Sequence, residues 1–142
     1  MNATDKLLEL GRRAIACPDW AWMPGMLARS VDTPARSYRV LRVQDNGRVH
    51  CDGGYQFGGT MRSKDSIPAF NDPATIGCMM YLVRAALNDP SICWVPDIGQ
   101  RGGWGIASRL RSSDESLSAV RLGDTLADAL VVALESFERA DE

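Results

Sequence analysis

Apolar residues spaced three and four apart predict a central helix over residues 72–87. Asp72 can cap this helix, and Pro73 suits its first position because the N–H group that proline lacks would be unpaired there anyway. The helix carries one broad apolar stripe, which other elements must cover. The residues of the stripe are Ile76, Met79, Met80, Val83, Ala86 and Leu87. This helix is therefore a core element, and its pattern does not indicate a function.

Two further helices are predicted near the ends of the chain. The first runs from Thr4 or Asp5 to about Cys17, where a proline follows. The last begins near Thr125, and Asp128 is placed to complete an approximate capping box with it. Each helix has apolar residues on one side only, so both are expected to pack against a sheet.

Alternating and β-branched stretches predict two hairpins. Residues 38–43 and 48–51 flank Asp45-Asn46-Gly47, which suits a tight turn because Asn and Gly tolerate positive φ. Residues 91–95 and 104–110 form the second strand pair across a glycine-containing loop.

These elements predict an α+β fold, with a mainly antiparallel sheet of about five strands and three helices packed on it. The length of 142 residues suits a single domain, residues 1–142. No apolar run approaches the roughly 18 residues of a membrane span, and the N-terminal residues lack the features of an export signal. We therefore expect no membrane partner.

The charge is unevenly distributed. A formal net charge of -2 disfavours a broad nucleic-acid surface, yet basic residues concentrate between Arg29 and Lys64. Arginine clusters recognise phosphate or carboxylate in a bidentate manner, although a GC-rich genome also enriches arginine. Arg39 and Arg42 are an odd number of positions apart, so on a regular strand they point to opposite faces.

Residues 20–26 have the most unusual composition, with two tryptophans and two methionines around a Pro-Gly turn. One interpretation is that these side chains plug one end of the core. The other is an aromatic surface for a protein partner, built from Trp20, Trp22 and Met26. The large apolar content also makes a homodimer plausible.

A candidate ligand site combines aromatic and basic residues. Residues 53–59 form a glycine-flanked loop that encloses two aromatics and precedes two basic residues. Aromatic faces stack on bases while Arg or Lys holds phosphates, so such a set could capture a small nucleotide. The alternative is that the aromatics are core and the charges are solvated. The candidate residues are Tyr55, Phe57, Arg62, Lys64, Trp94, Arg101 and Trp104.

The sequence carries no recognisable catalytic, metal or cofactor motif. His50 is the only histidine, and on a strand it faces away from the adjacent Cys51, which disfavours a shared metal. A nucleophilic pair of His50 with Cys78 or Cys93 is also disfavoured, since helix-face thiols are usually small hydrophobes. Four carboxylates at loops or element ends lack the spacing of an acid/base pair: Asp52, Asp65, Asp72 and Asp97. We expect a protein that is not an enzyme and needs no cofactor.

Two segments carry a resemblance. The segment from Trp20 to Met26 and the helix start from Asp72 to Met80 resemble small accessory proteins of tailed bacteriophages and prophages. These proteins pair an aromatic-Met-Pro-Gly-Met segment with Asp-Pro-Ala-Thr-Leu-Gly-Cys-Leu-Leu, where this chain has Ile76, Met79 and Met80 at the leucine positions. The resemblance implies a phage origin and a small α+β fold, and it brings no catalytic residues.

The resemblance favours a non-catalytic protein that counters host defence by binding, in the cytoplasm of the host bacterium. In the favoured version it sequesters a small nucleotide signal. In the first alternative it inhibits a host defence complex directly, as anti-CRISPR proteins do. A small hydrolase or phosphodiesterase and a minor virion or assembly protein are further alternatives.

Overall fold

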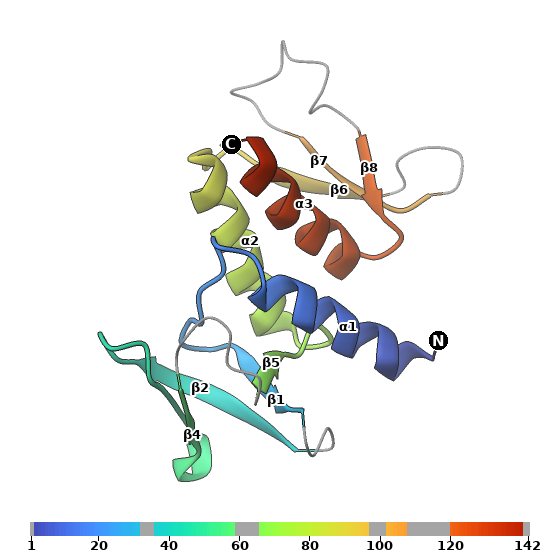
Figure 1. The fold of residues 1–142 in the computed structure, drawn as a ribbon. Helices are drawn as coiled ribbons and strands as arrows, with labels where there is room; N and C mark the ends of the chain where they lie inside the picture. The colour runs from blue at the N-terminus through green and yellow to red at the C-terminus, as the bar shows by residue number, and fades with distance from the viewer. Residues whose placement is uncertain (1, 32–35, 59–65, 97–101, 108–119, 141–142) are drawn as a thin grey trace. The chain divides into compact units, whose positions relative to one another are not determined.

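The chain divides into two compact units, Met1–Met79 and Met80–Glu142, whose boundary lies inside helix α2 (Pro73–Leu87). The computed structural model describes residues 2–31, 36–58, 66–96, 102–107 and 120–140 (Figure 1).

The first unit contains helix α1 (Ala3–Ile15) and a five-stranded antiparallel sheet in the order β4-β3-β2-β1-β5 (Figure 1). A short 3₁₀ turn, η1, follows β3. The strands and this turn are β1 (Leu27–Ser30), β2 (Ser37–Val43), β3 (Val49–Cys51), η1 (Asp52–Gly54), β4 (Gln56–Phe57) and β5 (Ser66–Pro68). The predicted first hairpin is confirmed, because β2 and β3 pair across the expected turn.

The inner face of this sheet forms the core of the first unit. Residues that pair across strands share a face, so the register places a set of small and apolar residues on the same side. All of them are buried: Ala28, Val40, Val49, Cys51, Phe57, Ser66 and Pro68. The opposite face carries polar residues on β2 to β4, but at β5 it carries the buried Ile67, which pairs with Arg29 and contacts Gly11 of α1.

The N-cap of helix α1 lies earlier in the chain than Thr4 or Asp5, the start that the sequence predicts. Asn2 is the N-cap, and its side chain accepts a hydrogen bond of 2.8 Å from the backbone N of Asp5. The helix ends at Ile15 and packs against β5 through the buried Gly11.

The start of α2 is as predicted. Asp72 accepts a hydrogen bond of 2.9 Å from the backbone N of Thr75, which is an N-cap contact. The buried stripe differs from the predicted one because Thr75 and Leu82 are buried while Ile76 and Met80 are partly exposed. The helix therefore presents a face that is rotated from the predicted stripe.

The second unit contains a three-stranded antiparallel sheet in the order β6-β7-β8, with helix α3 (Leu126–Ala140) packed on β8 and β7. Its strands are β6 (Cys93–Pro96), β7 (Trp104–Ala107) and β8 (Val120–Gly123). The capping box of α3 is confirmed, because Thr125 Oγ1 accepts a 3.1 Å bond from Asp128 N and Thr125 N donates a 3.1 Å bond to the Asp128 carboxylate.

The α+β class, the five-stranded antiparallel sheet and the three helices are confirmed. The prediction did not include a second sheet, and it missed β1, β4, β5 and β8. These strands are two to four residues long, and a stretch that short has no periodicity to detect.

Candidate functional site

A β-bulge in β2 brings two arginines to the same face of the first sheet. Val40 and Arg42 pair with adjacent residues of β3, so Leu41 is an extra residue between them. Arg39 and Arg42 therefore share the outer face, where regular alternation would place them on opposite faces. The prediction of opposite faces holds for a regular strand and is wrong for this one.

The bulge completes a polar surface that we call the basic face. Along a strand, its members alternate with the buried residues of the inner face. Across β1 to β4, its members lie opposite other residues of the same face. Leu41 lies among them with 59% of its surface exposed. The basic face consists of Arg29, Arg39, Leu41, Arg42, Arg48, His50 and Gln56.

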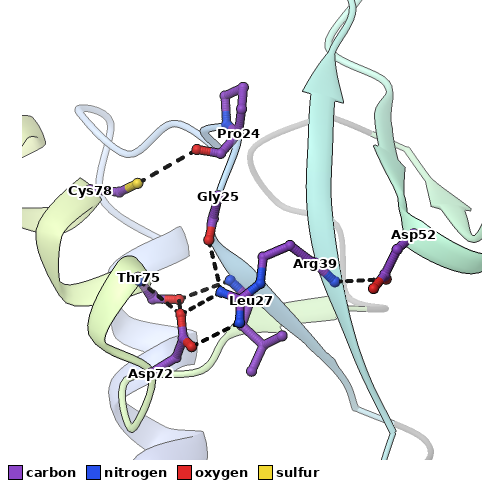
Figure 2. Close-up of polar contacts among 8 residues, drawn as sticks. All are labelled: Pro24, Gly25, Leu27, Arg39, Asp52, Asp72, Thr75 and Cys78. Carbon is purple, nitrogen blue, oxygen red and sulfur yellow. Dashed lines mark hydrogen bonds and ion pairs between the residues drawn. The ribbon is translucent and has the colours of Figure 1, made fainter.

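Arg39 is occupied by structural contacts (Figure 2). Its guanidinium donates to both carboxylate oxygens of Asp72, at 2.7 and 3.0 Å, and to the backbone oxygen of Gly25 at 2.9 Å. Its backbone N donates to Asp52 at 2.9 Å. The hydrogen bonds from Arg39 lower the pKa of Asp72, and the same bonds raise the pKa of Arg39. This pair is therefore ionised at neutral pH.

Thr75 extends the same cluster to β1. Its hydroxyl donates to Asp72 at 2.9 Å and accepts a 2.8 Å bond from the backbone N of Leu27 (Figure 2). The Asp-Pro-Ala-Thr segment thus joins the start of α2 to two strands. Because its polar atoms are used by one another, this cluster supports the fold and has little capacity left for a ligand.

Arg42 and Arg48 remain available to solvent. Arg42 is exposed, and its side chain makes no hydrogen bond or ion pair within the described part of the chain. Arg48 is exposed, and its Nε donates to Gln56 at 2.9 Å, which leaves its terminal nitrogens unused. An open depression of about 550 Å³ lies beside Arg42 at the end of the hairpin. Its lining residues are Arg42, Val43, Gln44, Asp45 and Asn46.

Two more nitrogen atoms of the basic face lack partners. Arg29 Nε and His50 Nε2 are buried atoms without a hydrogen-bond partner among the described residues. A buried polar atom without a partner is costly to the fold, and because both atoms are buried they are not accessible to a ligand from solution. His50 lies between Arg42 and Gln56 in the register of the three strands.

The aromatic residues of the predicted ligand site in the first unit belong to its inner face. Tyr55 stacks on Tyr38 with ring centroids 4.0 Å apart, and its hydroxyl lies 3.2 Å from Ser66 Oγ. Phe57 is buried and contacts Trp22 edge-on at 5.1 Å. Phe57 is therefore not accessible for stacking on a base, and one face of the Tyr55 ring is already covered.

Trp94 and Trp104 share one face of the second sheet, since Trp94 pairs with Ile106 and Trp104 pairs with Pro96. The guanidinium of Arg84 lies 5.2 Å from the ring centre of Trp94. Among the described residues, Arg84 is thus the cation that contacts Trp94, and the sequence analysis did not predict this contact.

The predicted set is divided between the two units. Tyr55 and Phe57 belong to the first unit, and Trp94 and Trp104 belong to the second. The three basic members of the set lie outside the described residues: Arg62, Lys64 and Arg101.

The aromatic segment at residues 20–26 is core. Trp20, Trp22 and Met26 are 1%, 7% and 0% exposed, and the two indoles pack edge-on at 5.4 Å. The predicted partner surface required these side chains to be exposed, and the structure corrects it. A buried aromatic pair stabilises the core through its large buried area and its edge-on contact.

The thiols and carboxylates show no activated arrangement. Burial raises the pKa of Cys51 to about 11, and burial also raises the pKa of Cys78, so both thiols are protonated at neutral pH. Within the described ranges, no three His, Cys, Asp or Glu residues gather as a metal site. Asp65 and Asp97 lie outside the described residues.

No helix in the part of the chain that the structure describes is long and apolar enough to cross a bilayer.

Sequence reasoning noted the excess of basic residues but did not find the basic face. The bulge that aligns Arg42 with Arg39 leaves no mark in the sequence pattern, and the pairing of Gln56 depends on a strand of two residues. The Asn-Gly turn was the one available signal, because it fixes which residues of β2 and β3 lie opposite each other.

Comparisons with protein-family models, with curated proteins and with solved structures found no match to this chain.

Proposed function

We propose that this protein acts by binding a small nucleotide on its basic face, without catalysing a reaction. The observation that carries the proposal is the exposed pair Arg42 and Arg48, which the register places on one face with their terminal nitrogens unused. Arginine donates two parallel hydrogen bonds to a phosphate, and such charge-assisted pairs are about twice as strong as neutral hydrogen bonds.

The electrostatics of the basic face favour an anion. Asp72 is neutralised by Arg39, so it does not cancel the charge of the other arginines. Asp45 is the acidic residue that lines the depression beside Arg42. The protein as a whole carries a formal charge of -2, which disfavours unspecific attraction of long polyanions.

The biological role that we propose rests on the resemblance to phage accessory proteins. In this role the protein sequesters a nucleotide signal of host defence in the cytoplasm of the infected bacterium. Sequestration needs affinity and abundance but no turnover, which agrees with a site that consists of phosphate-binding groups.

The test is thermal melting of the full chain against a panel of mononucleotides and linear and cyclic oligonucleotides. A ligand at about 100 times its Kd stabilises the fold by about 2.7 kcal/mol, which is a shift of several degrees. We expect Arg42→Ala and Arg48→Ala to lose the shift and to melt like the parent protein without ligand, because both side chains are exposed.

Arg12→Ala is the matched control. Arg12 is an exposed arginine of α1, and it lines a depression together with Asp5 and Glu9. Its positive charge is thus surrounded by carboxylates, and its removal should leave the ligand shift intact. Absence of a shift across the whole panel would contradict the proposal.

Leu41 favours one second candidate, direct inhibition of a host defence protein. Leu41 is 59% exposed beside Arg42, and an apolar side chain next to an arginine supplies contact area that a protein partner could cover. If the partner is a protein, Leu41→Ser should weaken its capture from host lysate, whereas a nucleotide held through phosphates should bind the variant normally.

A further inference from the structure

We infer that the basic face takes a ligand with two phosphates separated by a sugar, which is a short oligonucleotide and not a nucleoside monophosphate. This inference rests on the proposed function and specifies the ligand class of the same site. It follows from the positions of Arg42 and Arg48 on different strands and from the contacts that hold one of them.

The side chains of Arg42 and Arg48 lie at different positions on the basic face. His50 lies opposite Arg42, and Arg48 precedes His50 by two residues, so the two arginines are diagonal neighbours. The backbones of such neighbours are about 7–8 Å apart. Arg48 is held toward β4 by its bond to Gln56, on the other side of β3 from Arg42. Arg42 lines the depression at the hairpin end. The guanidinium groups therefore form two separate phosphate positions.

His50 lies between these two positions, and its side chain is partly exposed on the basic face. Its Nε2 has no partner among the described residues, and its strand separates the strands of Arg42 and Gln56. The sugar that connects two phosphates would lie over this imidazole. A mononucleotide that occupies one of the two positions leaves the other arginine unused.

The occupant is short because the basic face is small. The exposed arginines span β2 and β3, and the net charge of -2 leaves little attraction for a longer chain beyond them. Charge complementarity therefore matches two phosphates, one for each exposed arginine.

The experiment measures the affinity of the full-length protein for three probes at several salt concentrations. The probes are adenine and guanine nucleoside monophosphates, the corresponding cyclic dinucleotides and linear dinucleotides with a terminal phosphate, and single strands of about ten nucleotides. We expect the dinucleotides to bind at least about tenfold more tightly than the mononucleotides. The logarithm of the binding constant should fall with the logarithm of salt at a slope of about -1.4, which is about 0.7 for each phosphate.

Arginine variants test which side chain binds each phosphate. Arg42→Ala and Arg48→Ala should each reduce the slope by about 0.7, and Arg12→Ala should not change it. Asp45→Asn should strengthen binding, because it removes the negative charge that lies beside Arg42. The longer strands should show the same slope as the dinucleotides.

Several results would overturn the inference and leave the proposed function standing. These are equal affinity for mononucleotides and dinucleotides, a slope that only one arginine affects, or a slope that grows with strand length. If no probe binds at all, the proposed function itself fails.

Discussion

The carboxylate of Asp72 serves both as helix cap and as ion-pair partner, and the two roles can be separated. Asp72→Asn keeps a good N-cap residue but removes the charge that Arg39 contacts. We expect the variant to lose about 1 kcal/mol of unfolding free energy at about pH 7. Because Arg39 is partly exposed, water replaces part of the lost interaction.

The pH dependence has a definite sign. The folded protein lowers the pKa of Asp72, so its carboxylate stabilises the fold above the unfolded value of about 3.9. This contribution disappears as the pH falls through the folded pKa. Urea unfolding at about pH 7 and at about pH 3 should thus show a difference between parent and variant that shrinks in acid. A difference that stays constant would contradict this expectation, because it would show that the ionisation of Asp72 does not contribute to stability.

Single residues also show what the sequence can and cannot predict. The roles of Asp72 and Thr125 follow from local rules, since a cap contacts its own helix. The aromatic residues were ambiguous because the same side chain suits a core or a ligand. The ring of Tyr55 stacks on Tyr38, which is distant in the sequence, so no local pattern predicts this contact.

The helices offer a matched pair of glycines. A methyl group at Gly11 of α1 would lie 3.0 Å from Ile67 Cβ and 3.0 Å from the backbone oxygen of Pro68, which cannot move independently of β5. A methyl group at Gly77 of α2 would meet nothing within 4 Å. Gly77→Ala should therefore stabilise the protein by up to about 1 kcal/mol through helix propensity. Gly11→Ala should destabilise it by about 1–3 kcal/mol because it forces α1 away from β5.

Urea unfolding midpoints of the two variants provide the measurement. Both substitutions are the same chemical change in a helix, so a shared effect of propensity cancels in their difference. If Gly11→Ala were as stabilising as Gly77→Ala, the contact of α1 with β5 would be looser than the structure has it.

Elements were predictable in proportion to their length and regularity. The helices and the β2–β3 hairpin follow from periodicity and from turn residues that act locally. The short strands at the sheet edges form because a neighbouring strand offers unpaired backbone groups, and this information is not contained in the segment itself. The same limitation hid the bulge, and with it the face on which Arg42 lies.

At the scale of the molecule, one predicted domain has to be reconciled with two compact units. The length of 142 residues favours one cooperative domain, and α2 runs through the boundary between the units. Helix formation is cooperative along the chain, so unfolding of one end of α2 destabilises the other end. We therefore expect the two units to unfold together in one transition.

The tryptophans make this expectation testable, since each unit contains one pair of them. Replacing Trp94 and Trp104 by Phe leaves Trp20 and Trp22 as reporters of the first unit, and the opposite pair of replacements reports the second. In each variant the fluorescence transition in urea should coincide with the transition of the far-ultraviolet circular dichroism, which monitors the whole chain. Comparison within a variant removes the destabilisation caused by the replacements themselves. If fluorescence from one unit changes before the dichroism, the chain consists of two domains that unfold separately.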